Sequence, residues 1–377
     1  MFVTHLSLVD FRNYASADVA LEPGVTVFVG ANGQGKTNLL EALEYLATLG
    51  SHRVSAEAPL IRAGAERALV RARIQAGLED ERRLLAEIEL IPGKANKAAL
   101  NRSPLRRARD ILGSLRVVLF SPEDLALVKG DPADRRRFVD ELATARWPRL
   151  AGVRADYDKV LRQRSALLKS LAGRFAIPAE AESTLSIWDE QLARFGAEII
   201  AARTATLSDL APFLATAYAD IAPARDAAAA SYKSAGGFDA ASGALEIAAA
   251  LQARMLERRR DELARGVSLV GPHRDDVTLT LGEFPAKGYA SHGESWSFGC
   301  ALKLASFMLL REDGVEPVLL LDDVFAELDA ERRERLAATA LTAEQVLITA
   351  AVAADVPVAL SGQRYSVRDG KVTRDPA

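Results

Sequence analysis

Hydrophobic and polar residues alternate along several short stretches near both ends of the chain, which is the pattern of half-buried β-strands. The first stretch covers residues 1–10, and further strands are predicted over residues 25–29, 68–74 and 83–90. Strands return after residue 266, including residues 346–349 and a hairpin around Asp369 and Gly370. Residues 317–321 are apolar throughout, which predicts a strand buried on both faces, as in a parallel sheet.

Between residues 106 and 265 the pattern becomes helical and rich in alanine. Long helices are predicted over residues 135–171, 185–222 and 240–264, with a loop at residues 173–183 and a turn at Gly236 and Gly237. A helix of about 37 residues is roughly 55 Å long. The chain is therefore expected to form an α/β head interrupted by a short helical stalk or lobe, not by a long coiled-coil arm.

Residues 30–37 follow a predicted strand, lead into a predicted helix and match the phosphate-loop pattern G-x-x-x-x-G-K-[ST]. The glycines allow backbone N–H groups to face a phosphate, and the helix that begins near Lys36 adds the positive end of its dipole. In this interpretation Lys36 reaches the outer phosphates and acts in catalysis, and Thr37 holds Mg²⁺. The alternative is a glycine-rich turn with no ligand. The predicted nucleotide-binding residues are Gly30, Ala31, Asn32, Gly33, Gln34, Gly35, Lys36, Thr37 and Asn38.

Asp322 and Asp323 follow the buried strand at residues 317–321. Two carboxylates at such a place are costly unless a cation meets them. In the Walker B role Asp322 binds Mg²⁺ through its water shell, and Asp323 is the catalytic residue that polarises the attacking water. The alternative for Asp323 is that it caps the following turn. Together the two segments predict a P-loop ATPase head, formed by residues 1–105 and 266–377, that uses ATP and Mg²⁺; residues 106–265 form its helical insertion.

Composition sets the outer limits of this interpretation. The chain has 377 residues, of which 49% are hydrophobic, so it can bury one large core or two moderate ones. Cys300 is the single cysteine, which excludes an intramolecular disulfide and fits a reducing compartment. The first residues lack the plan of a signal peptide, and no apolar run approaches the roughly 20 residues of a membrane span. We therefore expect a cytoplasmic protein.

A formal net charge of −3 argues against a molecule that is basic overall, but cations are concentrated locally. Such clusters form either a duplex-binding surface or the solvated faces of helices, and composition leaves both possibilities open. The basic residues concerned are Arg102, Arg106, Arg107, Arg109, Arg116, Lys129, Arg135, Arg136, Arg137, Arg146, Arg149, Arg154, Lys159, Arg162, Arg164 and Lys169.

Several motifs, in this order, resemble those of the RecF family, the recombinational-repair ATPases of the ABC and SMC class. The resemblance covers nearly the whole chain and implies an ABC-type head. The motifs are Asp10-Phe-Arg-Asn-Tyr14, Gly30-Ala-Asn-Gly-Gln-Gly-Lys-Thr-Asn-Leu-Leu-Glu-Ala42, Phe120-Ser-Pro-Glu-Asp-Leu125, Val128-Lys-Gly130 with the run of arginines at residues 135–137, Gly271-Pro-His-Arg-Asp-Asp276, Ser291-His-Gly-Glu294 and Leu321-Asp-Asp-Val-Phe-Ala-Glu-Leu-Asp329.

The segment Ser291-His-Gly-Glu294 is similar to the ABC signature, which by family analogy contacts the γ-phosphate held by a second subunit. A serine hydroxyl and a glycine N–H at a helix start suit an anion, so Ser291 and Gly293 are the predicted contacts. Glu294 departs from the commoner glutamine. A helix N-cap without a ligand is the alternative for this segment.

The resemblance implies two further nucleotide-site residues. Arg12 is similar to the arginine that touches nucleotide phosphate in related heads, with a surface charge as the alternative. Asp329 is similar to the D-loop acid that bridges two heads, with helix capping as the alternative. Where many ABC transporters have a histidine after the last strand, this chain offers only Thr349, which implies slow turnover.

By resemblance the protein is a weak, DNA-stimulated ATPase whose ATP-induced homodimer binds DNA at gaps and promotes RecA loading with RecR and RecO. The helical lobe of residues 106–265 is expected to face the DNA and to form the clamp of the dimer. A structural tether of the SMC type and a P-loop phosphotransferase are the alternatives. The short insertion argues against the first, and the Ser291 motif has no use in the second. His273 lies near two aspartates, but the chain has four histidines and no zinc-like spacing, so a structural role is expected.

Overall fold

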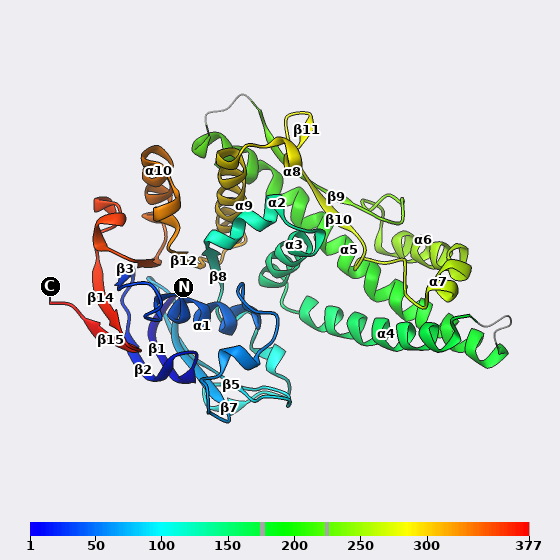
Figure 1. Cartoon of the computed structure of the whole chain (residues 1–377), viewed down its shortest axis with the longest axis horizontal. Helices are drawn as coiled ribbons and strands as arrows, with labels where there is room; N and C mark the ends of the chain where they lie inside the picture. The colour runs from blue at the N-terminus through cyan, green and yellow to red at the C-terminus, as the bar shows by residue number, and fades with distance from the viewer. Residues whose placement is uncertain (174–177, 223–225, 377) are drawn as a thin grey trace. The chain divides into compact units, whose positions relative to one another are not determined.

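The computed structural model describes residues 1–173, 178–222 and 226–376 (Figure 1). The chain divides into two compact units. The first unit comprises Met1–Val128, Pro212–Ala227 and Ala290–Ala377. The second unit comprises Lys129–Ala211 and Ala228–Tyr289. Each unit has its own hydrophobic core.

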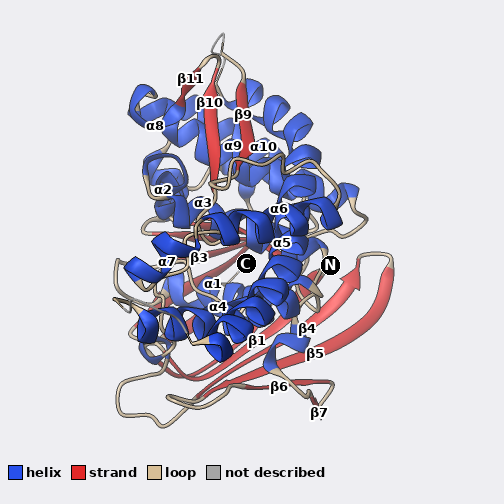
Figure 2. Cartoon of the chain, turned by 90° about the vertical axis from the view of Figure 1, so that its right-hand side faces the viewer, coloured by secondary structure: helices blue, strands red, loops and turns tan. Residues whose placement is uncertain are grey.

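The first unit contains an antiparallel sheet of six strands in the order β2-β1-β4-β5-β6-β7. Figure 2 shows its long strands β1, β4 and β5 side by side. Alternating buried and exposed positions, as in β4, place one face of this sheet on the core. The strands are β1 (Phe2–Phe11), β2 (Tyr14–Ala20), β4 (Ala68–Gly77), β5 (Asp80–Leu90), β6 (Lys97–Leu100) and β7 (Ser103–Pro104).

A second sheet of the first unit has the order β15-β14-β3-β13-β12-β8. All neighbours are parallel except β14 and β15, so the carboxyl ends of β3, β12, β13 and β8 meet at one edge. Open sheets of this kind bind ligands outside that edge. The strands are β3 (Gly24–Val29), β8 (Val117–Phe120), β12 (Val318–Asp322), β13 (Gln345–Ala350), β14 (Gln363–Arg368) and β15 (Lys371–Arg374).

Helices complete the first unit. Leu39, Leu40 and Leu43 of α1 are fully buried in the same core cluster as residues of both sheets. The helices are α1 (Lys36–Thr48), α2 (Leu125–Lys129, whose last residue belongs to the second unit), α9 (His292–Glu312) and α10 (Ala330–Ala340). Short 3₁₀ helices lie at Ala58–Leu60, Ala108–Ile111, Pro122–Asp124, Val324–Glu327, Ala353–Asp355 and Val358–Leu360.

The second unit is mainly helical, with a small sheet in the order β11-β10-β9. Tyr157 and Val160 of α4 share a buried cluster with Leu192 and Ile200 of α5. The helices are α3 (Pro132–Arg146), α4 (Leu150–Leu171), α5 (Ala179–Ile221, shared with the first unit), α6 (Ala244–Glu257), α7 (Arg259–Arg265) and α8 (Ala286–Tyr289). The strands are β9 (Ala228–Lys233), β10 (Asp276–Leu281) and β11 (Phe284–Pro285).

Four sequence-based expectations are wrong in detail. The helix predicted over residues 135–171 is two helices, because Pro148 between α3 and α4 has no N–H to donate and fixes its own φ. The helix predicted over residues 240–264 is likewise divided, at Arg258. The α5 helix is longer than predicted and continues through Pro212. Of the loop predicted over residues 173–183, residues 174–177 lie outside the described ranges, and residues 179–183 belong to α5.

The division into units also differs from the boundaries expected at residues 105 and 265. Strand β8 lies within the expected insertion but pairs with β12 of the second sheet. Conversely, β10 lies beyond residue 265 but pairs with β9 in the second unit. Four apolar residues make too short a strand to stand out inside a helical stretch. Within the described ranges, no helix is both long enough and apolar enough to cross a membrane.

Candidate functional site

The glycines of the P-loop are required by its geometry. Gly33 and Gly35 have φ angles of 80° and 109°, which side chains rarely allow. A Cβ on Gly30 would lie 2.2 Å from the carbonyl oxygen of Val367. The loop is therefore packed against β14 and turns sharply into α1, whose N-cap, Gly35, offers no side chain to its first N–H groups. Those N–H groups suit an anion.

Lys36 is 95% buried, and its side chain hydrogen-bonds to the first residues of its own loop. Its Nζ donates to the carbonyl oxygens of Gly30, at 2.7 Å, and Ala31, at 3.2 Å. Both acceptors belong to the P-loop, so the ammonium group lies within the curve of that loop. This is where a lysine that meets the outer phosphates is needed.

Asp322 brings the two separated sequence segments together. Its Oδ1 accepts hydrogen bonds from Thr37 Oγ1, at 3.0 Å, and Thr349 Oγ1, at 2.6 Å. Burial raises the pKa of Asp322, and these two hydrogen bonds only partly oppose the rise. A nearby cation stabilises the ionised form of a carboxylate whose pKa is raised by burial.

Asp323 follows in a left-handed conformation, with φ 56°, at the start of a 3₁₀ helix. Its N–H donates to Thr349 Oγ1 at 3.0 Å, so Thr349 links both aspartates. The side chain of Asp323 does not cap this 3₁₀ helix by a hydrogen bond. Backbone strain of this kind is concentrated at functional sites.

Asn13, in the turn between β1 and β2, and Tyr14, the first residue of β2, hold the P-loop, and the sequence pattern alone did not assign them. Asn13 Nδ2 donates to the carbonyl oxygen of Gln34 at 3.0 Å, and Asn13 Oδ1 accepts from Asn38 Nδ2 at 2.8 Å. Tyr14 Oη donates to the carbonyl oxygen of Gly35 at 3.0 Å. Both lie in the motif at residues 10–14, but only the fold brings them to the loop.

Arg12 belongs to an ion-pair network and is not a surface charge. Its Nε donates to Glu41 Oε2 at 2.7 Å, its Nη2 pairs with Glu41 Oε1 at 2.5 Å, and its Nη1 donates to the carbonyl oxygen of Pro59 at 3.0 Å. Burial acts to raise the pKa of Glu41, but the hydrogen bonds from Arg12 and Ser51, together with the charges of Arg12 and Arg53, hold that pKa below its usual value. A nucleotide contact by Arg12 stays a prediction.

Ser291, Gly293 and Glu294 form the N-terminus of α9, as a capping box. Ser291 Oγ accepts from the Glu294 N–H at 3.2 Å, and Glu294 Oε2 accepts from the Ser291 N–H at 2.8 Å. These hydrogen bonds lower the pKa of Glu294. The carboxylate of Glu294 therefore takes part in capping α9, so the N-cap expected as the alternative for this segment is present. Contact of Ser291 and Gly293 with a second copy stays a prediction.

Asp329 caps α10 by accepting from the N–H of Arg332 at 3.0 Å, and its other oxygen pairs with the guanidinium of the same arginine. The capping alternative is thus present here too, and a bridging role between copies stays a prediction. Arg332 itself was not anticipated.

Several cations of the stretch after residue 129 form ion pairs within the second unit, although Lys159, Arg162 and Lys169 of the same stretch are exposed. Arg135, Arg146 and Arg154 pair with Asp276, Asp209 and Asp140, respectively. Arg164 is fully buried, where it binds Asp189 at 2.7 Å and Glu262 at 2.6 Å. In contrast, the side chains of Arg102, Arg106 and Arg107 in the first unit are exposed.

The ring of His273 makes two hydrogen bonds within the second unit, as a structural residue would. Its Nδ1 meets Tyr157 Oη at 2.6 Å, and its Nε2 meets the carbonyl oxygen of Ser268 at 3.3 Å. Burial lowers the pKa of His273 to about 4, so the ring is neutral, with Nε2 protonated and Nδ1 as acceptor. In the described part of the chain, no group of three or more histidine, cysteine, aspartate or glutamate side chains is placed to hold a metal.

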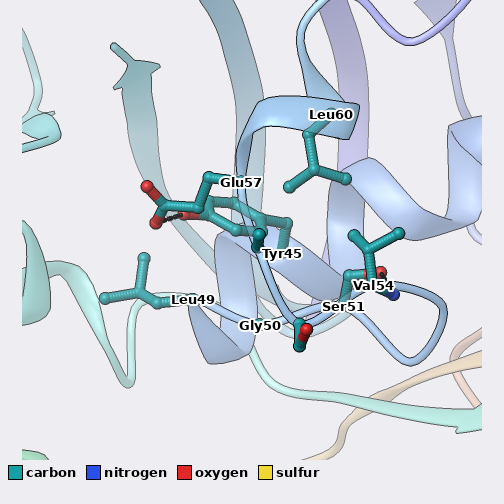
Figure 3. A pocket seen from close by; sticks show the side chains of 9 residues that line it. Tyr45, Leu49, Gly50, Ser51, Val54, Glu57 and Leu60 are labelled. Atoms are coloured by element: carbon teal, nitrogen blue, oxygen red, sulfur yellow. Dashed lines mark hydrogen bonds between the residues drawn. The ribbon is translucent and has the colours of Figure 1, made fainter. Parts of the chain in front are cut away.

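A cavity of about 340 Å³ lies beside the carboxyl-terminal part of α1 (Figure 3). Tyr45, Leu49 and Leu60 line it, and Tyr45 Oη donates to Glu57 Oε1 at 2.5 Å. None of the predicted site residues lines this cavity. The candidate site is instead the carboxyl edge of the second sheet.

Comparison with known proteins gives a consistent result. The family model described as RecF/RecN/SMC N terminal domain matches residues 2–367. The chain is 59% identical to a DNA replication and repair protein RecF of Streptomyces avermitilis, over 99% of this chain and 100% of the relative. It is 56% identical to the protein so described in Cutibacterium acnes, over 99% of this chain and 98% of the relative.

Solved structures agree with the sequence relatives. A structure of the recombination mediator protein RecF with ATP, in the RecFOR pathway, has a TM-score of 0.89 at 28% identity and covers 100% of this chain and 98% of that chain. An Smc head domain from Pyrococcus furiosus has a TM-score of 0.54 at 18% identity and covers 99% of this chain and 96% of that chain. The predicted α/β fold class, an ABC-type head with mixed sheets, is confirmed.

Proposed function

The chain belongs to the RecF family of DNA replication and repair proteins, and from this premise we propose that it is an ATP-dependent DNA-binding protein whose nucleotide sites are shared between two copies. The observation that carries the proposal is the cluster of Lys36, Thr37, Asp322 and Thr349 at the carboxyl edge of the second sheet. The motif order and the RecF relative solved with ATP support the same nucleotide.

The residues present fit a divalent cation. Thr37 Oγ1 and Asp322 Oδ1 are oxygen ligands 3.0 Å apart, and oxygen is what Mg²⁺ prefers. The buried carboxylate of Asp322 is stabilised by positive charge. Thr37 would hold Mg²⁺ directly and Asp322 through the metal's water shell; when bound, the metal would neutralise charge on the phosphate oxygens.

The chain's own groups have distinct roles in this proposal. Lys36 and the P-loop N–H groups bind the phosphates, and Arg12 and Asn38 are further contacts of the nucleotide. Asp323 orients the attacking water and accepts its proton. Ser291 and Gly293 of one copy close over the γ-phosphate held by the other, and Asp329 bridges the copies. ATP therefore stabilises the homodimer, and hydrolysis releases it.

Hydrolysis is expected to be weak, because Thr349, which donates to Asp322, stands where many transporters have a histidine. Its stimulation by DNA is proposed from the family resemblance. The dimer binds DNA at gaps, at junctions of duplex and single strand, and promotes RecA loading with RecR and RecO. Family membership supports this setting, and the relative solved in the RecFOR pathway supports RecO and RecR as partners. No observation favours a phosphotransferase or a structural tether.

Asp323→Asn tests the catalytic assignment. We expect this variant to bind ATP as the wild type does but to hydrolyse it roughly 10²-fold more slowly, because it cannot accept the proton of the attacking water. Lys36→Met is expected to lose ATP binding itself. Equilibrium binding of a fluorescent ATP analogue and phosphate release measure the two properties. Wild-type hydrolysis by Asp323→Asn would contradict the assignment.

DNA binding is tested at the exposed arginines of the first unit. Arg102, Arg106 and Arg107 are replaced together by glutamine, and this variant is expected to bind DNA more weakly. Its affinity should also depend less on salt: the slope of log affinity against log salt should become shallower by about 0.9 for each phosphate that the variant no longer neutralises. Gel shifts with duplex, single-stranded and gapped DNA, with and without ATP, provide the measurement. The matched control replaces Lys159, Arg162 and Lys169 of α4 together by glutamine. If only this control binds DNA more weakly, the DNA-binding surface lies in the second unit.

A further inference from the structure

Arg332 lies beside the signature segment at the start of α9. A Cβ built on Gly293 would be 3.4 Å from Arg332 Nη2, which makes this amino group the nearest heavy atom to that position. Arg332 is at the first turn of α10, three residues after Asp329, so the fold brings together two segments that are almost 40 residues apart. Its side chain is 27% exposed.

The guanidinium of Arg332 is held on two sides. Nε donates to Ser297 Oγ at 2.9 Å, and Ser297 Oγ in turn donates to the carbonyl oxygen of Gly293 at 3.0 Å. Nη1 pairs with the carboxylate of Asp329, whose other oxygen accepts the Arg332 N–H. Nη2 has no hydrogen bond to any residue that the structure describes. Because the guanidinium is already fixed in this way, its Nη2 group can bind a ligand without a large further loss of side-chain entropy.

A carboxylate belongs to the signature segment itself, residues 291–294. Glu294 carries a carboxylate at the N-terminus of α9, and the hydrogen bonds of the capping box favour its ionised form. A phosphate that approaches Ser291 and Gly293 meets this negative charge. Arg332 is the arginine beside the same segment, and its guanidinium opposes in sign the carboxylates of Glu294 and Asp329.

We propose that Arg332 is a catalytic residue that acts in trans, contacting the γ-phosphate bound by the P-loop of a second copy; this inference rests on the proposed function. In the hydrolysis step, the water oxygen forms a bond to the γ-phosphorus. The bond from that phosphorus to the bridging oxygen breaks, and its electron pair stays on ADP. The proton of the water passes to Asp323. Arg332 stabilises the charge that spreads over the phosphoryl oxygens, which is the role of arginines in other phosphoryl-transfer sites.

Arg332→Gln is the direct test. This variant is expected to bind ATP and to dimerise with ATP, but to hydrolyse ATP at least 10²-fold more slowly, on the scale of arginines that complete a site in trans. Arg335→Gln is the matched control, because Arg335 lies one turn further along α10 and pairs with Glu331. The control should keep the wild-type rate within about twofold.

Mixing two inactive variants separates an action in trans from a structural role. When Arg332→Gln is mixed with Asp323→Asn, the mixed dimer contains one site with an intact P-loop, an intact Asp323 and the Arg332 of the other copy. Hydrolysis should return to roughly a quarter of the wild-type rate, because about half of the dimers are mixed and each has one active site. No recovery, while both variants still dimerise with ATP, would overturn the inference.

The outcomes also distinguish this inference from the proposed function. If the wild type forms no dimer with ATP, the shared-site function itself is contradicted. If the wild type dimerises and hydrolyses ATP but Arg332→Gln has the wild-type rate, only the role of Arg332 is contradicted. If Arg332→Gln loses ATP-induced dimerisation while the wild type keeps it, Arg332 shapes the signature segment and is not catalytic.

Discussion

Individual residues outside the phosphate loop determine the conformation of that loop. Asn13 and Tyr14 together accept or donate three hydrogen bonds that end at Gln34, Gly35 and Asn38. The approach to Gly35 is so close that a Cβ there would lie 2.6 Å from the Asn13 side chain. The nucleotide affinity of Lys36 and Thr37 therefore depends on a turn that precedes them by about twenty residues.

Asn13→Ala is expected to weaken ATP binding by roughly five- to tenfold, since it removes two hydrogen bonds worth about 1 kcal/mol in total. Titration calorimetry with ATP and Mg²⁺ measures the effect. The control is Asn96→Ala, because Asn96 makes comparable side-chain hydrogen bonds to Tyr45 and Glu57, away from the P-loop. Equal decreases in affinity in the two variants would show that Asn13 acts only through general stability.

The residues of the site differ in how far the sequence alone could assign them. Lys36 and Thr37 follow a short local pattern, and Asp322 ends an apolar run, so both segments were predictable before the fold was known. Asn13 and Arg332 carry no such local pattern. Their partners lie 21 and 35 residues away, and only the folded chain brings each pair together.

Helices of the second unit are joined by buried ion pairs that no helical periodicity could reveal. Arg164 of α4 is fully buried and binds Asp189 of α5, Glu262 of α7 and Ser268. Arginine is usually assigned to the surface, so the spacing of charges along residues 129–169 suggested a basic face. Tertiary pairing overrides that pattern, as Pro148 overrides the continuity of the helical periodicity.

Arg164→Met is expected to lower the free energy of unfolding by about 3–5 kcal/mol, because it leaves the carboxylates of Asp189 and Glu262 buried without this partner. Arg162→Met, an exposed position on the same helix, should change it by less than about 0.5 kcal/mol. Chemical denaturation followed by the fluorescence of Trp147 and Trp188, which belong to the second unit, measures both. Similar stability of the two variants would contradict the structural role of Arg164.

For the whole molecule, the sequence predicted a head with an insertion, and the structure contains two units, each with its own core. The predicted boundaries missed β8 and β10, because the pairing of a short strand with a distant one is not visible in local sequence. The central claim concerns more than one molecule: the signature segment of one copy completes the phosphate site of another. Family membership and the placement of Ser291 at a helix start support this claim.

Analytical ultracentrifugation tests that claim most directly. With ATP and Mg²⁺, the wild-type chain should sediment as a dimer, and without nucleotide the dimer fraction should fall. Ser291→Arg should bind ATP but remain monomeric, because a bulky cation at the cap of α9 prevents closure over the γ-phosphate. A wild-type chain that binds ATP and stays monomeric would contradict the shared site.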